Sequence, residues 1–393
     1  MTSAQSAPLT RKLPATAETV VVGGGLAGAA AACVLARAGR EVLVLEREAS
    51  AAHKMCGDFL STETQGYLRR LGVDLDAFGG HVTTHVRLVC QKHIVETALP
   101  FTGLGVSRFL LDEALLDRAR QNGAQLWRGQ RAGVTSHDDA LVIDFQGAGS
   151  VRTKTLFLAT GKQDMRGLRR QPAVFPEDLV GFKMYFDVNA AQRFAMAGHV
   201  ELILFRHGYA GLQRVEGGQV NLCLLVERNW LMECGGTWQC LLHALLRCCP
   251  HLQRRLWDAT PLLAHPLSIY RVPYGFVYQP PVGQGGDIYR LGDQVGVIPS
   301  FSGDGMGIAL HSGVLAAGHY LSGLDAGHYH RRILQDITGQ IGRAGMIYRA
   351  SRWGPGQRLL MGWAGMLPQT LKLAARLTRV PPPAVARAMR FLD

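Results

Sequence analysis

A glycine-rich turn near the N-terminus limits the fold of this chain more than any other feature. Residues 19–48 hold a β-branched run, the motif Gly23-x-Gly25-x-x-Gly28, an alanine-rich stretch and a second apolar run that ends at Glu46. A strand, a tight glycine turn, a helix and a second strand in this order are typical of a dinucleotide-binding βαβ unit. The sequence therefore predicts an α/β fold that binds a nucleotide at this turn.

Each glycine of the motif has a separate task. Gly23 permits the tight turn, Gly25 lets a pyrophosphate approach the backbone, and Gly28 lets the helix pack closely on the strand. The N-terminus of the helix then offers N–H groups and a positive dipole end to the phosphates. Glu46 is placed to accept hydrogen bonds from an adenosine ribose, which favours FAD or NAD over NADP. This motif alone does not separate FAD from NAD.

A second glycine-rich turn lies within residues 289–313. A short strand leads to Gly292-Asp293, a loop carries Pro299, and the glycines at 303, 305 and 307 lead into a helix that is expected to begin near Met306. The pattern resembles the C-terminal flavin motif of the para-hydroxybenzoate hydroxylase and geranylgeranyl reductase superfamily, written GD followed by P-x-x-G-x-G. The resemblance implies that Asp293 binds the ribityl or pyrophosphate part of FAD. It also implies that the helix N-terminus faces the N1–C2=O edge of the flavin, where reduced flavin carries negative charge.

The resemblance extends to the segments between the two motifs. Arg108 opens a stretch similar to the R-x-x-L-D helix of the family, whose arginine reaches the cofactor phosphates. A buried run then ends at Thr160-Gly161-Lys162, where many monooxygenases of the superfamily carry Asp-Gly. That motif is tied to both FAD and NAD(P)H, so its absence departs from the family's way of handling NAD(P)H.

Residues 53–61 read HKMCGDFLS and contain a cysteine without a partner cysteine close in sequence. No second metal ligand lies near it, and no base can be named that would activate Cys56 as a nucleophile. The segment resembles the K-x-C-G element of the geranylgeranyl reductase branch, which runs along the flavin. The resemblance implies that Cys56 and Gly57 pack beside the isoalloxazine or shape its substrate side, with Lys54 holding negative charge. Because an unpaired cysteine usually behaves as a small hydrophobe, packing is favoured over thiol chemistry.

Between residues 181 and 274 the pattern changes to alternating apolar and polar runs, with a hairpin signal at Glu216-Gly217-Gly218. This alternation predicts an antiparallel sheet that roofs the flavin and holds the substrate beneath it. Tyr274 or Phe276, which follow this region, are expected to line the pocket. The polar candidates of the sheet itself are Lys183, Tyr185, His207, Tyr209, Gln213 and Asn221.

The expected fold is α/β, with an FAD-binding Rossmann-like domain of the glutathione reductase type, an inserted antiparallel β-sheet substrate domain and a helical C-terminal tail. The expected divisions are a disordered leader over 1–16, a discontinuous FAD-binding domain over 17–80, 105–180 and 275–328, a substrate domain over 81–104 and 181–274, and a basic helical region over 329–393.

The formal net charge of +12 is concentrated in that last region. Residues 331–393 hold eleven Lys or Arg against two Asp, interleaved with apolar side chains, which indicates helices with a cationic and an apolar face. Such faces either pack on the core and meet solvent, or contact an anionic membrane or an acidic redox protein. Nucleic acid is not expected, because no reading motif is present.

Eight cysteines without a C-x-x-C pair fit reduced thiols and neither a disulfide framework nor a metal site. The polar first residues lack the apolar core of a signal peptide. We therefore expect a cytoplasmic protein, with membrane association as the open alternative.

The motifs together predict an FAD-dependent oxidoreductase, with NAD(P)H as the expected electron donor, that acts on a hydrophobic aromatic, polyketide-like or isoprenoid-like molecule. A monooxygenase, the broader expectation for the superfamily, would add oxygen to an electron-rich ring. A reductase, favoured by K-x-C-G, would pass a hydride from the flavin to a C=C bond. The alternative from another class is a flavoprotein electron carrier to a quinone or an acidic redox partner.

The candidate site residues follow from these motifs. Catalytic residues are not identified by the sequence, and the candidates near the flavin are Cys56, Lys183 and Tyr274. No metal site is expected. The residues expected to bind the cofactor are Gly23, Gly25, Leu26, Ala27, Gly28, Glu46, Arg47, Lys54, Cys56, Gly57, Arg108, Gly161, Gly292, Asp293, Pro299, Gly303, Gly305, Met306 and Gly307.

Overall fold

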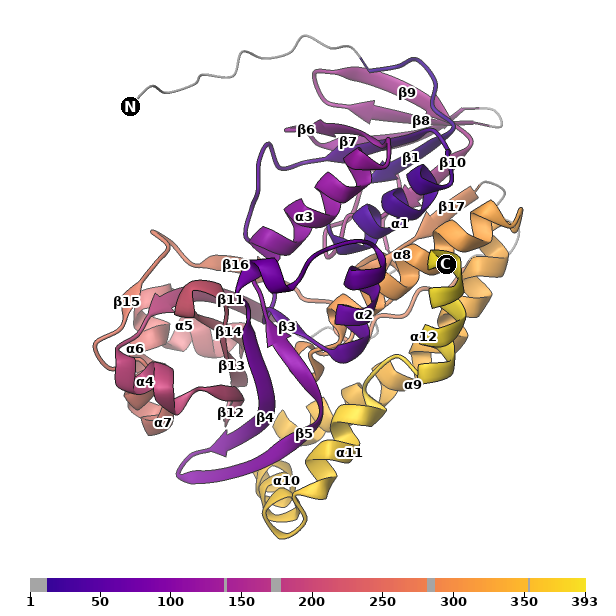
Figure 1. Cartoon of the computed structure of the whole chain (residues 1–393). Coiled ribbons are helices and arrows are strands. Elements are labelled where there is room, and N and C mark those ends of the chain that lie inside the picture. The colour runs from indigo at the N-terminus through magenta and orange to yellow at the C-terminus, as the bar shows by residue number, and fades with distance from the viewer. Residues whose placement is uncertain (1–12, 138–139, 171–177, 281–286, 353) are drawn as a thin grey trace.

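A computed structural model describes residues 13–137, 140–170, 178–280, 287–352 and 354–393 of the chain. Two sheets organise the molecule, one in each of its two halves (Figure 1). The first is a five-stranded parallel sheet in the order β17-β10-β1-β2-β6. Its strands are β1 (Thr19–Val22), β2 (Val42–Glu46), β6 (Gln125–Arg128), β10 (Thr155–Leu158) and β17 (Asp287–Arg290).

Helices cover one face of this parallel sheet and a small sheet covers the other. The helices are α1 (Leu26–Arg37), α3 (Arg108–Gln121) and α8 (Gly305–Leu321), and they share a core with alternate residues of the strands. The small sheet is β7 (Ala132–His137), β8 (Ala140–Phe145) and β9 (Gly149–Thr153), which packs on the remaining strand residues. Because both faces are covered, the three inner strands β1, β2 and β10 are almost wholly apolar, as the runs around the first motif predict.

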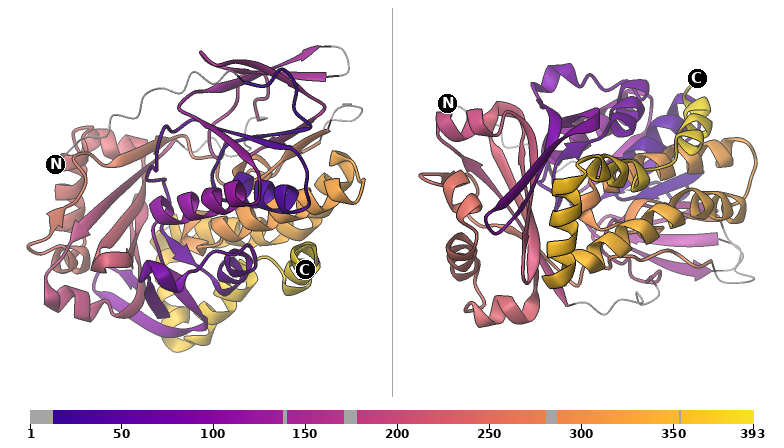
Figure 2. Two further views of the ribbon diagram at one scale, coloured as in Figure 1. Left: turned by 45° about the horizontal axis from the view of Figure 1, so that its top comes forward. Right: turned by 90° about the horizontal axis from the view of Figure 1, so that it is seen from below.

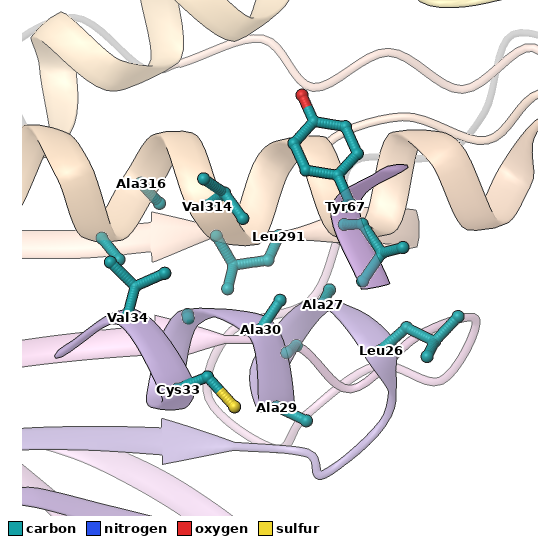
Figure 3. Close-up of a cluster of buried hydrophobic side chains, with 14 of the residues drawn as sticks. Leu26, Ala27, Ala29, Ala30, Cys33, Val34, Tyr67, Leu291, Val314 and Ala316 are labelled. Carbon is teal, nitrogen blue, oxygen red and sulfur yellow. The ribbon is translucent and has the colours of Figure 1, made fainter. Parts of the chain in front are cut away.

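Small residues let α1 and α8 approach each other closely (Figure 3). A Cβ on Gly313 of α8 would stand 2.3 Å from the carbonyl oxygen of Ala27 of α1, so only glycine fits there. Figure 3 shows Ala27 and Ala30 on the side of α1 that faces Leu291 and α8. The alanine-rich stretch thus serves helix packing, and the close approach aligns the N-termini of the two helices with the same sheet edge.

The second sheet has nine strands and is mixed, where the sequence predicts an antiparallel one. The path runs β15-β11-β14-β13-β12-β4-β5-β3, with β16 paired to β11. β4 and β12 pair in parallel. This is possible because β4 follows directly on the half of the molecule that contains the parallel sheet, and no hairpin joins it to β12. The bounds are β3 (Phe59–Leu60), β4 (His81–Cys90), β5 (His93–Gly105), β11 (Leu179–Asp187), β12 (Gly198–Phe205), β13 (Gly208–Arg214), β14 (Val220–Glu227), β15 (Thr260–Pro261) and β16 (Leu267–Tyr270).

Short helices cover the outer face of the nine-stranded sheet and leave the other face toward the first domain. They are α4 (Ala190–Ala195), α5 (Arg228–Glu233), α6 (Trp238–Cys248) and α7 (Pro250–Arg255). The hairpin predicted at residues 216–218 is present as a short 3-10 turn between β13 and β14. Gly217 and Gly218 take φ values of 63° and 74° there, which explains why glycine stands at both positions.

Four helices form the C-terminal region, as its periodicity indicates. They are α9 (Ala326–Arg352), α10 (Gly354–Met366), α11 (Gln369–Leu377) and α12 (Pro382–Met389). α9 and α12 pack on α8, while α10 and α11 lie against the β4–β5 hairpin (Figure 2). The helix α2 (Thr62–Arg70) also packs on α8. Among the helices that the structure describes, none is both long and apolar enough to cross a membrane.

The N-terminal leader predicted to be disordered over 1–16 falls in part outside the described residues. Where it is described, it is anchored: Leu13 is buried in the core between the two smaller sheets, and Arg152 donates its backbone N–H to the carbonyl of Ala15 at 2.9 Å. The expectation of disorder is therefore wrong for residues 13–16, because one apolar side chain and a strand edge hold them.

Candidate flavin and substrate cavity

A cavity of about 450 Å³ lies between the two sheets and is bounded below by α10 and α11. One end is lined by the glycine turns of α1 and α8, and the other by apolar side chains of the nine-stranded sheet. We call this space the central cavity. Most of the residues predicted to bind a cofactor line it: Gly25, Leu26, Ala27, Cys56, Gly57, Arg108, Gly161, Gly292, Asp293, Gly303, Gly305 and Met306.

The N-terminus of α1 forms one wall of the central cavity. Gly25 is its N-cap residue and no side chain caps the helix, so its first N–H groups are left for a ligand anion. The guanidinium of Arg108 stands beside this turn, because a Cβ on Gly25 would lie 3.3 Å from its Nη2. Asp112 holds that guanidinium with two contacts, 2.6 Å from Nε and 2.9 Å from Nη2. A fixed cation next to free helix N–H groups suits a pyrophosphate.

The remaining glycines of the first motif act behind this wall. A Cβ on Gly28 would stand 2.0 Å from the carbonyl oxygen of Gly23, and Gly23 itself has φ of 105°. Neither residue lines the central cavity, yet each is required for the turn that places Gly25 there.

The N-terminus of α8 faces the same cavity. A Cβ on Gly305, its first residue, would meet no atom within 4 Å, so the helix end is open to the cavity. The preceding residue, Asp304, does not cap the helix through its side chain. Its carboxylate instead accepts a hydrogen bond from the backbone N–H of Val380 at 3.0 Å and lies 3.4 Å from Nη1 of Arg379. Burial raises the pKa of Asp304 to about 7.

Two predicted residues of this second motif stay outside the cavity lining. Gly307 sits against the carboxylate of Asp304, where a Cβ would come within 2.5 Å of Oδ1. Pro299 starts the 3-10 turn Ser300–Ser302, which ends at Gly303 with φ of 69°. Both residues therefore shape the loop that presents Gly305.

An ion pair that the motifs did not predict lines the cavity between the two sheets. Nζ of Lys162 lies 3.0 Å from Oδ2 of Asp293, and each side chain is 24% exposed. Burial on its own would lower the pKa of Lys162, but the neighbouring carboxylate of Asp293 outweighs it and the pKa is raised. Lys162 therefore remains a cation at the edge of the predicted flavin site.

The HKMCGDFLS segment contains a buried carboxylate, that of Asp58. Oδ2 of Asp58 accepts hydrogen bonds from Nζ of Lys183 at 2.7 Å, from the hydroxyl of Tyr185 at 2.6 Å and from Nδ2 of Asn221 at 2.8 Å. Asp58 takes a left-handed φ of 59° and is fully buried. Three polar side chains from β11 and β14 thus converge on one acid, and their hydrogen bonds help to hold its left-handed backbone.

The same network holds the backbone on either side of Cys56. Lys183 also donates to the carbonyl of Lys54 at 3.1 Å, and Asn221 donates to the carbonyl of Cys56 at 3.0 Å. A Cβ on Gly57 would meet nothing within 4 Å, so this backbone is open to the cavity. Cys56 lines the cavity, whereas Lys183, predicted as a catalytic candidate, does not. Lys183 instead positions the segment that carries Cys56.

Three hydroxyl groups form a cluster in the cavity wall. Those of Tyr209 and Tyr274 lie 3.0 Å apart, and each contacts Oγ of Ser300 at hydrogen-bond distance. Burial raises the pKa of Tyr274 and places that of Tyr209 well above its ordinary value. Both phenols are therefore neutral proton donors. Tyr274 lines the pocket as predicted, whereas Phe276 does not belong to the lining.

Glu46 and Lys54 lie outside the central cavity, at the end of β2. Oε2 of Glu46 accepts the backbone N–H of Gly24 at 2.5 Å, and Oε1 accepts that of Glu48 at 2.9 Å. Lys54 approaches Oε1 of Glu46 to 3.8 Å. Glu46 thus braces the first glycine turn from behind, in addition to the predicted contact with a ribose.

Arg47 lies in a separate polar depression on the surface next to Glu46. Its guanidinium contacts the side chain of Gln163 and lies 3.0 Å from Oε1 of Glu48. Most of this depression was not predictable from the sequence, because its members come from four separate loops and form no motif. They are Arg47, Glu48, Gly129, Gln130, Arg131, Gln146 and Gln163.

The far half of the central cavity is apolar. Alternate residues of the strands point into it, while their neighbours pack under the outer helices. Of the polar candidates on the sheet, only Tyr209 and Gln213 reach the cavity; His207 pairs with Glu227 instead. The apolar lining consists of Val86, Leu88, Leu99, Val200, Leu202, Leu204, Ile347, Leu360, Trp363, Ala364, Leu371, Ala374 and Ala375.

The residues present fit FAD. The central cavity is bordered by two helix N-termini, by the fixed guanidinium of Arg108 and by the open backbones of Gly57 and Gly305. Each of these two glycines leaves space that any side chain would fill. Within the described parts of the chain, no group of three or more His, Cys, Asp or Glu side chains is arranged to hold a metal ion.

Residues 16–145 match the family of FAD-binding domains. Over longer stretches, the chain is 26% identical to the menaquinone reductase of Mycobacterium tuberculosis (strain ATCC 25618 / H37Rv) across 337 residues, which cover 77% of this chain and 76% of that protein. It is 32% identical to Protein FixC of Escherichia coli (strain K12) across 160 residues, or 37% of this chain and 36% of that one.

Solved structures of similar fold include flavin-dependent enzymes. The myxobacterial chondrochloren halogenase CndH superposes with a TM-score of 0.73 over 96% of this chain and 97% of its own, at 15% identity. A flavoprotein/dehydrogenase from Cytophaga hutchinsonii superposes with a TM-score of 0.69 over 96% of this chain and 100% of its own, at 16% identity. At these identities the likeness concerns the fold.

Proposed function

We propose that this FAD-dependent oxidoreductase reduces a carbon–carbon double bond of a long, apolar, isoprenoid-type lipid. The central cavity carries this proposal. It is continuous from the glycine turns that would hold the cofactor to a chamber lined by aliphatic side chains. Asp293 is the one carboxylate among its described lining residues, and Lys162 neutralises it. A chamber of this kind suits a hydrocarbon chain better than a charged substrate.

The curated relatives support a reductase over a hydroxylase. The menaquinone reductases match across both halves of the chain, and the substrate in their name is a lipid-soluble quinone. Hydroxylation is the broader expectation for the superfamily that the motifs resemble, whereas the K-x-C-G element favours a reductase. The turn Thr160-Gly161-Lys162 argues for the reductase as well, since the Asp-Gly motif of the monooxygenases is missing from it.

Reduced FAD, when bound, supplies a hydride for such a reaction. The chain has to supply a proton to the second carbon as the double bond is lost, and the neutral hydroxyl of Tyr274 is suited to this task. Tyr209 and Ser300, both in hydrogen-bond contact with Tyr274, hold the proton that replaces the one it gives. Lys162 and the N-terminus of α8 provide positive potential where reduced flavin carries negative charge.

The electrons are expected to come from NAD(P)H or from a protein donor. An electron carrier is the second candidate, because the chain is 30% identical over 198 residues to a protein of Escherichia coli (strain K12) named a probable electron transfer flavoprotein-quinone oxidoreductase. In that case the electrons pass from the flavin to a redox partner and no lipid double bond is lost.

The decisive experiment begins with the purified protein loaded with FAD and reduced under anaerobic conditions with NADH, NADPH or dithionite. A detergent-dissolved polyprenyl substrate is then added, and the product is analysed by mass spectrometry. Gain of two hydrogen atoms supports the proposal. Gain of an oxygen atom after air is admitted establishes hydroxylation instead, and an unchanged lipid with rapid reduction of an added quinone establishes the carrier.

A further inference from the structure

Helices α10 and α11 carry apolar side chains on their outer surface. Met366 is 84% exposed and Trp363 is 56% exposed, although large apolar residues of this kind are normally covered. We call this surface the α10–α11 platform. Its exposed apolar members are Leu359, Trp363, Met366, Leu367, Leu373 and Leu377.

Positive charge surrounds these side chains. Arg358, Lys372 and Arg376 belong to the same two helices, and the sequence holds no acidic residue from 337 to 392. Within the described structure, none of the three forms an ion pair with a carboxylate, whereas many other arginines do. An apolar surface ringed by unpaired cations matches the interface of an anionic bilayer.

The inner surface of the same helices borders the central cavity. Leu360, Ala364 and Leu371 line it from below, and Trp363 belongs both to the lining and to the exposed surface. One layer of helix therefore separates the apolar chamber from the apolar exterior. Val95 of the β4–β5 hairpin lies next to α10, since a Cβ on Gly365 would stand 3.9 Å from its Cγ2.

The tip of that hairpin carries an exposed apolar residue, Ile94, beside Lys92, and Figures 1 and 2 show the hairpin and α10 at the same end of the molecule.

We propose that the α10–α11 platform docks on an anionic lipid bilayer, so that a lipid substrate enters the central cavity between α10 and α11 without crossing water. A bilayer fits better than an acidic redox protein, because the most exposed members, Met366 and Leu359, are long, flexible aliphatic side chains that suit the acyl boundary of a bilayer. The docking does not depend on which reaction the cavity performs, and entry of the substrate rests on the proposed function.

The test uses the full chain loaded with FAD and sedimentation with vesicles. One set of vesicles contains phosphatidylcholine alone and the other contains equimolar phosphatidylglycerol. Three cations near the surface are expected to favour the anionic vesicles roughly a hundredfold. High salt should remove most of this preference.

Two variants probe the two halves of the interaction. The apolar variant combines Met366→Ser, Leu367→Ser and Leu373→Ser, none of which lines the cavity. The charge variant combines Lys372→Glu with Arg376→Glu. Each is expected to weaken binding to anionic vesicles at least tenfold while FAD absorbance and circular dichroism stay unchanged.

Matched controls come from other surfaces. Phe194→Ser removes an apolar side chain that is 85% exposed on α4, and Arg69→Glu with Arg254→Glu reverses two exposed cations on α2 and α7. Both controls should bind vesicles as the unchanged protein does. The proposal is overturned if the unchanged protein does not sediment with anionic vesicles, if the platform variants bind as well as the controls, or if an acidic redox protein, and no vesicle, competes for the platform. Activity on a detergent-dissolved lipid tests the proposed reaction separately.

Discussion

Nζ of Lys183 lies 2.7 Å from Oδ2 of Asp58, and both side chains are completely buried. The two residues join the nine-stranded sheet to the segment that carries Cys56 and Gly57. Removing one partner of a buried ion pair leaves the other charge without compensation, which costs about 3–5 kcal/mol. Asp58→Asn is therefore expected to lower the free energy of unfolding by that amount, even though asparagine tolerates the left-handed backbone of this position.

Chemical denaturation of the single variants and of Asp58→Asn combined with Lys183→Met measures this coupling. The double variant should recover part of the loss, because the unpaired cation is gone. If the two single losses simply add, the pair is not the interaction that holds the segment.

The ion pair of Lys162 with Asp293 predicts a change in cofactor binding and in redox potential. Lys162→Met leaves Asp293 as an uncompensated anion facing the cofactor. The dissociation constant of FAD should rise about tenfold, or about 1.4 kcal/mol. The midpoint potential should fall by about 30 mV if the lost stabilisation of reduced flavin is of similar size. Lys162→Arg keeps the charge and should stay near the unchanged protein in a spectroelectrochemical titration; equal effects of both variants would point to packing as the cause.

Cys56 lines the cavity, and its Sγ accepts the backbone N–H of Asp58 at 3.4 Å, while no base among the residues that the structure describes is in hydrogen-bond contact with it. Cys56→Ala is expected to keep FAD bound and to change turnover or substrate preference by a few fold. Absorbance of the bound flavin and steady-state kinetics check this. Complete loss of activity with normal flavin reduction would instead give the thiol a chemical role.

Gly211 faces the apolar half of the cavity from the middle of β13, with its nearest non-neighbouring atoms 3.8 Å or more from where a Cβ would stand. Gly211→Val fits the strand and takes up cavity space. We expect kcat/KM for the longest lipid to fall roughly tenfold, the range expected for a few methylene groups in an apolar pocket. A short-chain analogue and FAD binding should be unaffected; a uniform loss for all substrates would contradict this placement.

Glu201 is expected to make the free energy of unfolding depend on pH in the acid range. Its carboxylate is buried under α7, where His251 lies 2.7 Å and Arg255 2.9 Å away. Burial alone would raise the pKa of Glu201, but these partners lower it from an ordinary 4.5 to about 2. A carboxyl whose pKa is depressed by folding contributes stability above its unfolded pKa and loses it as the pH falls through the folded value.

The pH window for this effect is therefore about 4.5 down to about 2, and the contribution at neutral pH is about 3 kcal/mol. Glu201→Gln should destabilise the protein most at pH 7 and progressively less in acid, as followed by thermal unfolding. Glu96→Gln is the control: Glu96 lies 2.8 Å from Arg87, a residue that also contacts Glu201, but its side chain is 43% exposed, so its loss should cost less than about 1 kcal/mol. A constant difference at every pH would exclude this linkage.

The nucleotide site was predictable wherever its residues carry a local backbone requirement. Gly23, Gly25, Gly28 and Gly305 belong to strand–turn–helix units whose geometry depends on a few neighbouring residues. Such patterns can be recognised in the sequence alone. The alternation of β12 and β13 was predictable for the same reason, since a period of two assigns each residue to one face.

Partnerships between distant segments were not predictable. Lys162 meets Asp293 across 131 positions, and Lys183 meets Asp58 across 125. No local periodicity indicates such a contact, so the sequence suggested Lys183 as a catalytic candidate. In the structure its amino group binds the segment that carries Cys56. The parallel pairing of β4 with β12 was missed for the same reason, because it joins two separate excursions from the first domain.

By itself, the sequence determined the Rossmann-like unit, the two glycine turns that precede α1 and α8, and the cationic, apolar character of the last helices. Those properties depend on short segments and on composition, and they do not change with the way the other parts of the chain pack. The tertiary structure alone decided that a single cavity joins the glycine turns to an apolar chamber, that α10 and α11 close it from below, and that Asp58 anchors the cysteine segment. Each of these depends on burial of surfaces from separate parts of the chain against one another, and burial is a property of the packed molecule.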